Sequence, residues 1–494
     1  MSDFFPGNEP LVAMPEPKRP SGCRIALTLL AVLALLVMSA SGAIWYFFFR
    51  EKAEPGAVNA PVVVATAVPL DATQTVETIE PDAADSPTVP TVTSPALVGQ
   101  PPADGINRIV YVNEAGQLVT LASDGSDVRQ LTDEPLRFQF PAWSPDGRSI
   151  AAIGANRGGA GLFVLADSAV GDFPAPLYAD AEQGPFYLYW SPDSRQVSFL
   201  ANHPDGMGLH LVQADGSADS RLLTTGGPVY WQWLADSAQI FIHSGFSGDA
   251  SRLEIVAADG NGEGNSVASP GFFQAPGISA DGRYLAYAEV LTGNSNLVVI
   301  DTESEATVQQ RHAGQVALAW SPTANQLAFT NGTEPDSVSF VGPLRLLDAV
   351  TGEVRLISSE PIVAFFWSPD GRYLAAISVL RSGEGDINAQ EGSKVWAGKP
   401  LQQGNLPQLR LLVYDVAAGE GRVLFNFVPT FTFATQFLPF FDQYALSHQL
   451  WSPDSRALVL PMEENGRNQI FIINIVTGQK RYLADGTMPF WSPR

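Results

Sequence analysis

From residue 104 to the C-terminus, short apolar stretches alternate with short polar turns. In some stretches the character of the side chains alternates from one residue to the next, as in Tyr284-Leu285-Ala286-Tyr287. Others are apolar runs that end in tryptophan, as in Met488-Pro489-Phe490-Trp491. Stretches of this length and pattern predict β-strands, and the glycine, proline and aspartate residues between them predict turns. The pattern therefore predicts an all-β fold for residues 104–494.

A six-residue pattern, Trp-Ser-Pro-Asp-Gly-Arg or its variant with serine at the fifth position, returns along this region. Full copies begin at Trp143, Trp190, Trp367 and Trp451, weaker copies begin at Trp233, Ile278 and Trp320, and a truncated copy begins at Trp491. Successive copies are 47, 43, 45, 42, 47, 84 and 40 residues apart. Ser-Pro-Asp-Gly suits a type I turn, because proline presets φ at the second position and glycine accepts a left-handed fourth position. A period in the forties with such turns is typical of the four-stranded blades of a β-propeller.

Most of the tryptophans belong to this repeat. Seven of the ten occupy its first position: Trp143, Trp190, Trp233, Trp320, Trp367, Trp451 and Trp491. We interpret them as side chains that pack between blades rather than as ligand-stacking residues. This interpretation predicts a loss of about 3–5 kcal/mol of stability when one of them is replaced by alanine.

Eight copies of the repeat predict eight blades. The 84-residue interval does not require a ninth blade, because two insertions lengthen it, one between Leu374 and Asp415 and one between Asp415 and Trp451. Residues 108–112, 117–121 and 128–131 read as three strands without a tryptophan strand before them, and the terminal tryptophan strand has no three strands after it. We therefore expect an eight-bladed β-propeller closed by its N- and C-terminal strands, which leaves no open sheet edge between the two ends.

The N-terminal region has a different pattern. Residues 25–49 carry no charge, end in the aromatic run Trp45-Tyr46-Phe47-Phe48-Phe49 and have basic residues on both sides. As a helix this segment would be about 37 Å long, enough to cross a hydrocarbon core of about 30 Å. A cleaved signal peptide is the alternative, since small residues at 39–43 resemble a cleavage site. The long apolar run and the aromatic residues beyond that site favour a single transmembrane helix that acts as a signal anchor.

The segment that follows predicts a tether. Proline, threonine and acidic residues dominate it, and no helical period is present. Such a composition does not bury enough apolar surface to offset chain entropy, so we expect a disordered linker. The predicted organisation is a cytoplasmic tail at 1–24, a transmembrane helix at 25–49, a Pro/Thr-rich linker at 50–103 and the propeller at 104–494. The propeller would then be extracytoplasmic, in the periplasm or at the cell surface.

Charge and cysteine content exclude some functions. The chain has 28 Lys and Arg residues against 51 Asp and Glu residues, a net charge of −23 and a sequence pI near 4.5. Phosphate backbones repel such a polyanion, so nucleic-acid binding is not expected. The single cysteine, Cys23, excludes an intrachain disulfide and a cysteine-based zinc site.

Catalytic and metal-binding motifs are absent from the sequence. No G-x-S-x-G elbow occurs, and the five histidines show neither H-E-x-x-H nor another ligand spacing. Residues 259–265 resemble the start of a calcium loop, but Pro270 stands where the twelfth-position glutamate would be. We therefore expect no metal, no cofactor and no enzymatic activity.

The two insertions, at about 380–408 and 428–447, are the best candidates for a functional surface. Both should emerge on one face of the propeller, because alternate connections in an antiparallel blade lie on the same side. The second insertion is rich in aromatic residues, which favours either an exposed binding patch or a segment that folds back to cap the channel or pad the seventh blade. The candidate binding residues are Trp396, Phe431, Phe433, Phe437, Phe440, Phe441, Tyr444 and His448.

The repeat resembles the WD40-like (PD40) propeller repeat of the TolB family and of the N-terminal propeller in dipeptidyl peptidase IV-type proteases. The resemblance covers about 390 residues, 104–494, and implies an extracytoplasmic module that binds a protein or another ligand. TolB-like propellers have six blades and a preceding α/β domain, whereas here a membrane helix and a linker precede the repeats. The peptidase propellers have eight blades but are joined to a hydrolase domain, for which this chain has no room.

Three classes of function follow. The first is a membrane-anchored, non-enzymatic propeller that binds a protein or an envelope ligand through its loop-bearing face. The second is a propeller hydrolase or lyase with its site in the central channel, for which a carboxylate–histidine pair around His448 would be the sign. The third is a sensor, which the 24 N-terminal residues make a poor candidate.

Overall fold

The structure, a computed structural model, describes residues 107–493 except 169–172, 247–250, 262–263, 292–293, 335–338 and 381–405. The described residues all belong to one unit, which begins at Glu51, and a separate unit comprises Met1–Arg50. The predicted tail at 1–24, membrane helix at 25–49 and linker at 50–103 therefore lie outside the described residues. None of the helices in the described part is long and apolar enough to span a membrane.

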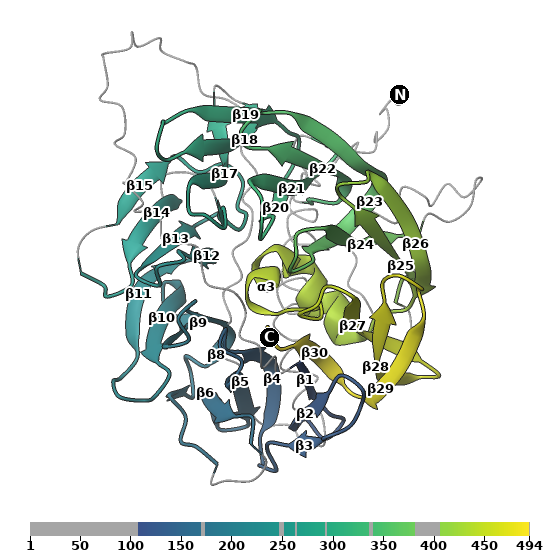
Figure 1. The fold of residues 1–494 in the computed structure, drawn as a ribbon. Helices are drawn as coiled ribbons and strands as arrows, with labels where there is room; N and C mark the ends of the chain where they lie inside the picture. Colours follow the sequence, from purple (N-terminus) through teal and green to yellow (C-terminus); the bar gives the residue numbers. More distant parts are fainter. Residues whose placement is uncertain are drawn as a thin grey trace, which may run out of the picture. The chain divides into compact units, whose positions relative to one another are not determined.

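Antiparallel sheets arranged around a common centre form the described unit (Figure 1). Four of these sheets each contain four consecutive strands. The first comprises β4 (Arg137–Trp143), β5 (Ser149–Asn156), β6 (Gly159–Ala166) and β7 (Tyr178–Asp180), and the second β8 (Pro185–Trp190), β9 (Gln196–His203), β10 (Gly206–Gln213) and β11 (Arg221–Gly226). The third comprises β12 (Val229–Trp233), β13 (Gln239–Ser244), β14 (Arg252–Ala257) and β15 (Asn265–Ala268), and the fourth β16 (Gly277–Ile278), β17 (Tyr284–Leu291), β18 (Asn294–Asp301) and β19 (Thr307–Arg311).

The next sheet has seven strands because one strand serves two neighbouring units. It comprises β20 (Val316–Trp320), β21 (Gln326–Asn331), β22 (Gly342–Asp348), β23 (Val354–Trp367), β24 (Tyr373–Val379), β25 (Leu409–Asp415) and β26 (Glu420–Phe427). The 14-residue strand β23 pairs mainly through its first half with β22 and through its second half with β24. A three-stranded sheet follows, with β27 (Ala457–Glu464), β28 (Arg467–Asn474) and β29 (Lys480–Asp485), and Trp451 bridges to Leu458 at its inner edge.

The remaining sheet joins the two ends of the described chain. Its order is β3 (Arg129–Gln130), β2 (Leu118–Ala122), β1 (Arg108–Val112) and β30 (Thr487–Trp491). Strand β30 pairs antiparallel with β1, with Ile109 opposite Trp491 and Val110 opposite Phe490. The last strand is therefore hydrogen-bonded to the first strand of the described region, although most of that region lies between them in the sequence.

The repeated turns have the same hydrogen bonds in each well-formed copy. The serine hydroxyl donates to the aspartate two residues later at 2.6 Å, as in Ser144–Asp146 and Ser452–Asp454. The fifth position has a left-handed φ whether it is glycine, as Gly147 at 71°, or serine, as Ser194 at 63°. Where serine stands there, its hydroxyl accepts the backbone N–H of the preceding turn's aspartate, as in Asp146–Ser194 at 3.0 Å. The serine variant of the repeat thus links neighbouring sheets.

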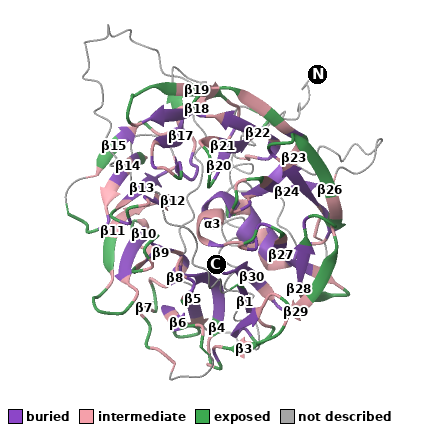
Figure 2. Cartoon of the chain, viewed as in Figure 1, coloured by how far each residue is buried: buried purple, intermediate pink, exposed green. Residues whose placement is uncertain are grey.

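Four of the repeat tryptophans make a second link between neighbouring units of the ring, where the seven-stranded sheet counts as two units divided at β23. In each of these four the indole N–H donates to the backbone carbonyl of the residue just before the tryptophan of the previous repeat. The pairs are Trp143 to Phe490, Trp190 to Ala142, Trp367 to Ala319 and Trp451 to Phe366, at 3.0–3.3 Å. Most of the core lies between the inner strands of adjacent sheets, whereas the outer strands are more exposed (Figure 2).

Arginines on the outer strands make a third link, which the sequence analysis did not anticipate. Each of five arginines at or near the start of an outer strand donates to a backbone carbonyl in the next unit along the ring. The pairs are Arg129 to Asp167, Arg221 to Ala258, Arg355 to Val416, Arg422 to Val476 and Arg481 to Ser123. The last pair connects the three-stranded sheet near the C-terminus to the sheet that contains β1.

Candidate functional site

Both insertions leave the same edge of one sheet. Val379, at the end of β24, pairs with Leu409, at the start of β25, and Leu409 pairs with Phe427, at the end of β26. The 380–408 insertion follows Val379, and the 428–447 insertion follows Phe427. Their points of departure therefore lie side by side, although residues 381–405 themselves, including Trp396, lie outside the described residues.

The second insertion folds into the centre of the ring as three short helical segments. These are a π-helical turn, η2 (Phe433–Phe437), a 3-10 turn, η3 (Leu438–Phe440), and α3 (Phe441–Ser447). Pro439 lies in the first turn of η3, where its missing N–H costs no helical hydrogen bond. Helix α3 contacts β8, β12, β20 and β23, which belong to three different sheets (Figure 1). We refer to residues 430–448 as the plug.

Aromatic side chains hold one side of the plug. Phe441 is 0% exposed, and its ring packs edge-on against the rings of Phe340, Phe365 and Phe366, with centroids 5.0–5.9 Å apart. Phe437 stacks on Phe490 of β30 with centroids 5.7 Å apart. This arrangement buries the plug against β23 on one side and the terminal strand on another.

Polar contacts hold the opposite side. The Gln443 side chain accepts the backbone N–H of Trp231 at 2.8 Å and donates to the carbonyl of the same residue at 2.9 Å. It also donates to the Tyr187 hydroxyl at 3.2 Å. Asp442 accepts the backbone N–H of Ala275 at 3.2 Å. Two neighbouring side chains of α3 thus bind β8, β12 and the segment before β16.

Asp442 is a buried carboxyl without a cationic partner. Its hydrogen bonds come from the backbone N–H groups of Ala275 and Gln443. Burial raises the pKa of Asp442 to about 6, and these hydrogen bonds oppose that shift only in part. Burial also raises the pKa values of the nearby Tyr187, Tyr230 and Tyr444. The three phenols therefore stay neutral, and none of them balances the charge of an ionised Asp442.

His448, at the end of α3, is buried and neutral. Its Nε2–H donates to the Phe140 carbonyl at 3.4 Å, so its Nδ1 accepts the Ser447 hydroxyl at 2.6 Å. Burial lowers the pKa of His448 to about 3, and the hydrogen bond to Phe140 opposes that shift. Ser447 and His448 therefore form a serine–histidine pair whose histidine is a weak base, because the surroundings disfavour its protonated form.

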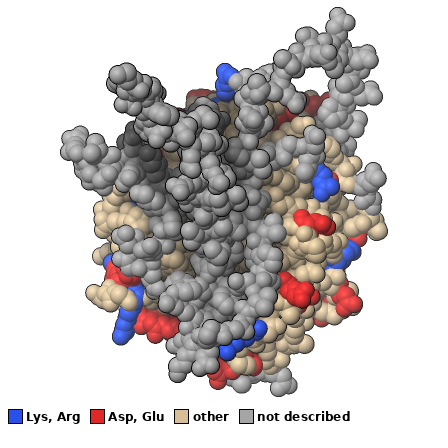
Figure 3. Space-filling model, turned by 180° about the vertical axis from the view of Figure 1, so that it is seen from behind, with Lys and Arg blue, Asp and Glu red and all other residues tan. Residues whose placement is uncertain are grey.

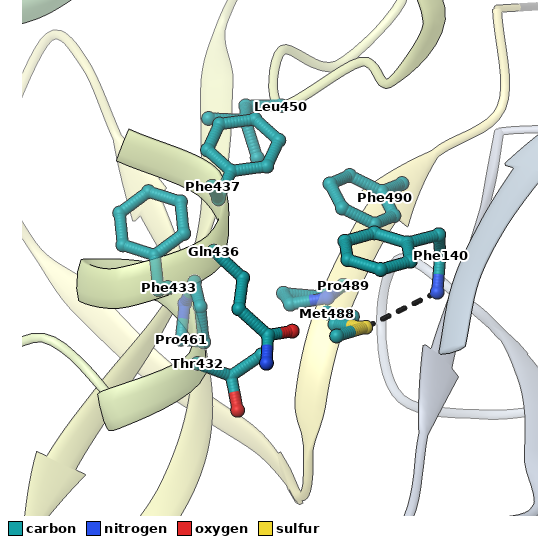
Figure 4. A pocket seen from close by; sticks show the side chains of 10 residues that line it. All are labelled: Phe140, Thr432, Phe433, Gln436, Phe437, Leu450, Pro461, Met488, Pro489 and Phe490. Carbon is teal, nitrogen blue, oxygen red and sulfur yellow. Dashed lines mark hydrogen bonds between the residues drawn. The ribbon is translucent and has the colours of Figure 1, made fainter. Parts of the chain in front are cut away.

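A small cavity lies between the plug and β30 (Figure 4). Its volume is about 10 Å³, close to the space that a single water molecule needs. Phe140, Thr432, Phe433, Gln436, Phe437, Leu450, Pro461, Met488, Pro489 and Phe490 line it. The backbone N–H of Phe140 donates to the sulfur of Met488 at 3.2 Å, and both residues have a left-handed φ of 51°. This contact holds the start of β30 beside β4.

The sequence allows two arrangements for the aromatic residues of the second insertion, an exposed patch and a segment folded back over the channel, and the structure shows the second. Phe433, Phe437, Phe441, Tyr444 and His448 are all buried, and Phe431 is half-buried. Phe440 is 45% exposed and is the one large apolar side chain of the plug that remains in solvent. The alternative, in which the insertion folds back over the channel, describes the plug. The aromatic residues are inside because the centre of the ring offers them apolar partners on several sheets.

Sequence reasoning missed the polar residues that position the plug. Asp442, Gln443 and Ser447 lie in the predicted insertion but were not singled out, and their partners Tyr187 and Trp231 lie more than 200 positions away. One feature of the sequence could have indicated these residues: the polar pair Asp442-Gln443 lies inside a stretch that is otherwise rich in aromatic residues. No group of three His, Cys, Asp or Glu side chains with metal-binding geometry occurs in the described parts of the chain.

Charged side chains of both signs are interspersed on the visible part of the face turned away from Figure 1 (Figure 3). Across the described residues, lysine is represented by Lys480 alone, which pairs with Glu464. Arginine supplies the other fixed positive charges, and many of these arginines are engaged in contacts between sheets.

The sequence matches no family model and no curated protein. Solved structures similar to this chain include TolB from Acinetobacter baumannii, which is 14% identical, with 73% of this chain and 82% of that chain covered and a TM-score of 0.33. Oligogalacturonate lyase from Vibrio parahaemolyticus is 13% identical, with coverages of 71% and 85% and a TM-score of 0.42. Apo AztD from Citrobacter koseri is 13% identical, with coverages of 78% and 96% and a TM-score of 0.44. A TolB structure is thus among those similar to this chain, and these likenesses concern the fold alone.

Proposed function

We propose that this chain is a membrane-anchored, extracytoplasmic β-propeller that acts as a non-enzymatic binding module. Residues 25–49 would anchor it, and a protein or envelope ligand would bind on the face from which the two insertions depart. The single observation that carries this proposal is the plug, which fills the centre of the ring with buried and mutually bonded side chains.

The proposal includes eight blades in a closed ring. Five sheets have four strands each, the seven-stranded sheet divides at β23 into two units, and Trp451 supplies an inner strand to β27, β28 and β29. Pairing of β30 with β1 and the Arg481 contact to Ser123 support closure between the last and first units. Because the strands are engaged in contacts within and between units, a partner would be recognised by the loops that connect them.

The plug also bears on the alternative, a hydrolase or lyase with its site in the channel. Ser447 and His448 are the chemically suggestive pair there, with 2.6 Å between Oγ and Nδ1. The low pKa of His448 makes it a poor general base at neutral pH. Its burial between Phe140, Tyr187, Tyr444 and Phe490 keeps substrate away from the ring nitrogens. A binding role accounts for this arrangement better than catalysis does.

Phe440 is the residue on which we expect partner binding to depend. It is an exposed aromatic side chain on the plug, and exposed aromatic residues often become the buried anchors of interfaces. We expect Phe440→Ala to weaken partner binding by at least about tenfold, because a hot-spot side chain contributes roughly 2 kcal/mol or more. The fold should be unaffected, since the side chain is half in solvent.

A site-specific photo-cross-linking experiment tests this proposal. A photoreactive amino acid is placed at Phe440 in the full chain, and the matched control is Val350, which is also exposed but lies in the turn at the opposite edge of its sheet. The binding module is supported if a defined partner is captured from position 440 but not from position 350. Unlabelled chain should compete for this capture, whereas the Phe440→Ala chain should not. Equal capture from both positions, or turnover of a hydrolase or lyase substrate abolished by Ser447→Ala, contradicts it.

A further inference from the structure

Two ionisable side chains of opposite type lie at the two ends of the same short helix, both buried and neither paired with an opposite charge. Asp442 follows the first residue of α3, and His448 follows its last residue. Neither side chain hydrogen-bonds to the other, and each has its own set of partners. The plug thus carries one potential negative and one potential positive charge into an apolar interior.

The surroundings of Asp442 disfavour its negative charge. Tyr187 of β8 and Tyr230 of β12 are the titratable groups that interact with it, and both are neutral phenols. The segment before β16 contributes the backbone N–H of Ala275. Within the described residues, no Lys, Arg or protonated His supports the carboxylate. Release of the plug into water would remove this penalty, so ionisation of Asp442 favours release.

The surroundings of His448 disfavour a positive charge in the same way. The rings of Phe140 from β4, Tyr187 from β8, Phe490 from β30 and Tyr444 from α3 surround the imidazole. Its polar partners are the Ser447 hydroxyl and the Phe140 carbonyl, and within the described residues no carboxylate pairs with it. Protonation of His448 therefore also favours release of the plug.

The two effects have opposite dependences on pH. For Asp442 the seated plug binds the proton more tightly than the released plug does, so seating weakens as the pH rises from about 4 to about 6. For His448 the released plug binds the proton more tightly, so seating weakens as the pH falls from 6.5 towards about 3. As the pH rises between about 4 and 6, the loss of seating caused by Asp442 grows while the loss caused by His448 shrinks, so their sum changes little.

We propose that Asp442 and His448 form a compensating pair that makes the seating of the plug in the channel nearly independent of pH. The pair acts through two separate buried sites at the ends of α3, not through a salt bridge. This inference is independent of the partner that the propeller binds, because it concerns the equilibrium between seated and released plug.

Hydrogen exchange of backbone amides in residues 433–447 measures this equilibrium. The full chain in detergent is studied between pH 4 and pH 8, with each rate divided by the intrinsic exchange rate at that pH. In Asp442→Asn, His448 acts alone, and we expect the released fraction to rise by more than about 100-fold from pH 8 to pH 4. In His448→Gln, Asp442 acts alone, and we expect a rise of about 50-fold in the opposite direction. The unaltered chain should change by less than about tenfold, because the two contributions nearly cancel.

Glu289→Gln is the matched control. This carboxyl lies on β17, outside the plug, and burial raises its pKa as well. The control should keep the flat profile of the unaltered chain. Profiles of the two plug variants that run parallel to the unaltered chain, or an unaltered chain as steep as either variant, would overturn the proposal. If His448→Gln prevents seating altogether, the ring carbons of His448 in the unaltered chain are titrated by NMR instead, and protonation near pH 6.5 would overturn the proposal while a neutral ring at pH 5 would support it.

Discussion

We expect Trp451→Ala to lower the free energy of unfolding by about 3–5 kcal/mol, the cost typical of removing a large buried aromatic side chain. Trp451 is 1% exposed, stacks on Tyr373 and donates its indole N–H to the Phe366 carbonyl of the neighbouring unit at 3.1 Å. Alanine would leave a cavity at this contact and an unpaired carbonyl. Urea denaturation followed by circular dichroism measures the loss.

Trp451→Phe is the control for this prediction. Phenylalanine keeps much of the apolar volume but lacks the N–H, so we expect a loss clearly smaller than that of alanine, with about 1–2 kcal/mol from the hydrogen bond. A loss below 1 kcal/mol for Trp451→Ala would contradict the interpretation of the repeat tryptophans as contacts between units.

The second large effect is expected at Phe441. Phe441→Ala removes a fully buried ring that contacts Phe340, Phe365 and Phe366, and we expect a loss of about 3–5 kcal/mol. Because this ring anchors the plug to β23, hydrogen exchange in residues 433–447 should accelerate more than exchange in the surrounding strands. Thermal and urea denaturation give the global effect, and exchange mass spectrometry gives the local one.

The neighbouring Phe440 provides a matched comparison within the same helical segment. Its side chain is 45% exposed, so Phe440→Ala should change stability by no more than about 0.5 kcal/mol. Equal losses from Phe440→Ala and Phe441→Ala would mean that the plug is not packed as described. A difference of several kcal/mol would establish that burial in the channel, not aromatic content, stabilises this insertion.

The strand pattern was accessible from sequence because the repeat encodes it locally. Each turn depends on a serine, an aspartate and a left-handed fifth residue that are close in the chain, as in Ser452, Asp454 and Ser455. Each inner strand ends in a tryptophan or its equivalent, which marks the register. The partner of the terminal strand also follows from counting the strands in each repeat. The first three strands lack an inner tryptophan strand, and the last strand of the chain supplies it.

The position of the second insertion was not accessible in the same way. A run of aromatic residues is compatible with an exposed patch or a buried plug, and the choice depends on surfaces supplied by distant strands. Gln443, for example, binds the backbone of Trp231, 212 positions away. No local rule pairs these two residues. The arginines of the outer strands were missed for a related reason, since their acceptors are backbone carbonyls, which leave no trace in the sequence.

The central claim is that the terminal strand completes the sheet formed by the first three strands, and one engineered disulfide tests it most directly. Val112 and Thr487 are register partners in the β1–β30 pair, just beyond a register irregularity between Val110 and Val112. Opposed residues in antiparallel strands have Cα atoms about 4.5–5.5 Å apart, and disulfides accept Cα separations of about 4.4–6.8 Å, so the pair is suited to a disulfide. Cys23 is the one native cysteine, so Cys23→Ser provides a clean background. With Val112→Cys and Thr487→Cys, the account predicts nearly complete formation of an intramolecular disulfide in the folded chain, seen as a mobility shift that reduction reverses. A folded protein in which these two cysteines stay free or form only intermolecular bonds would contradict it.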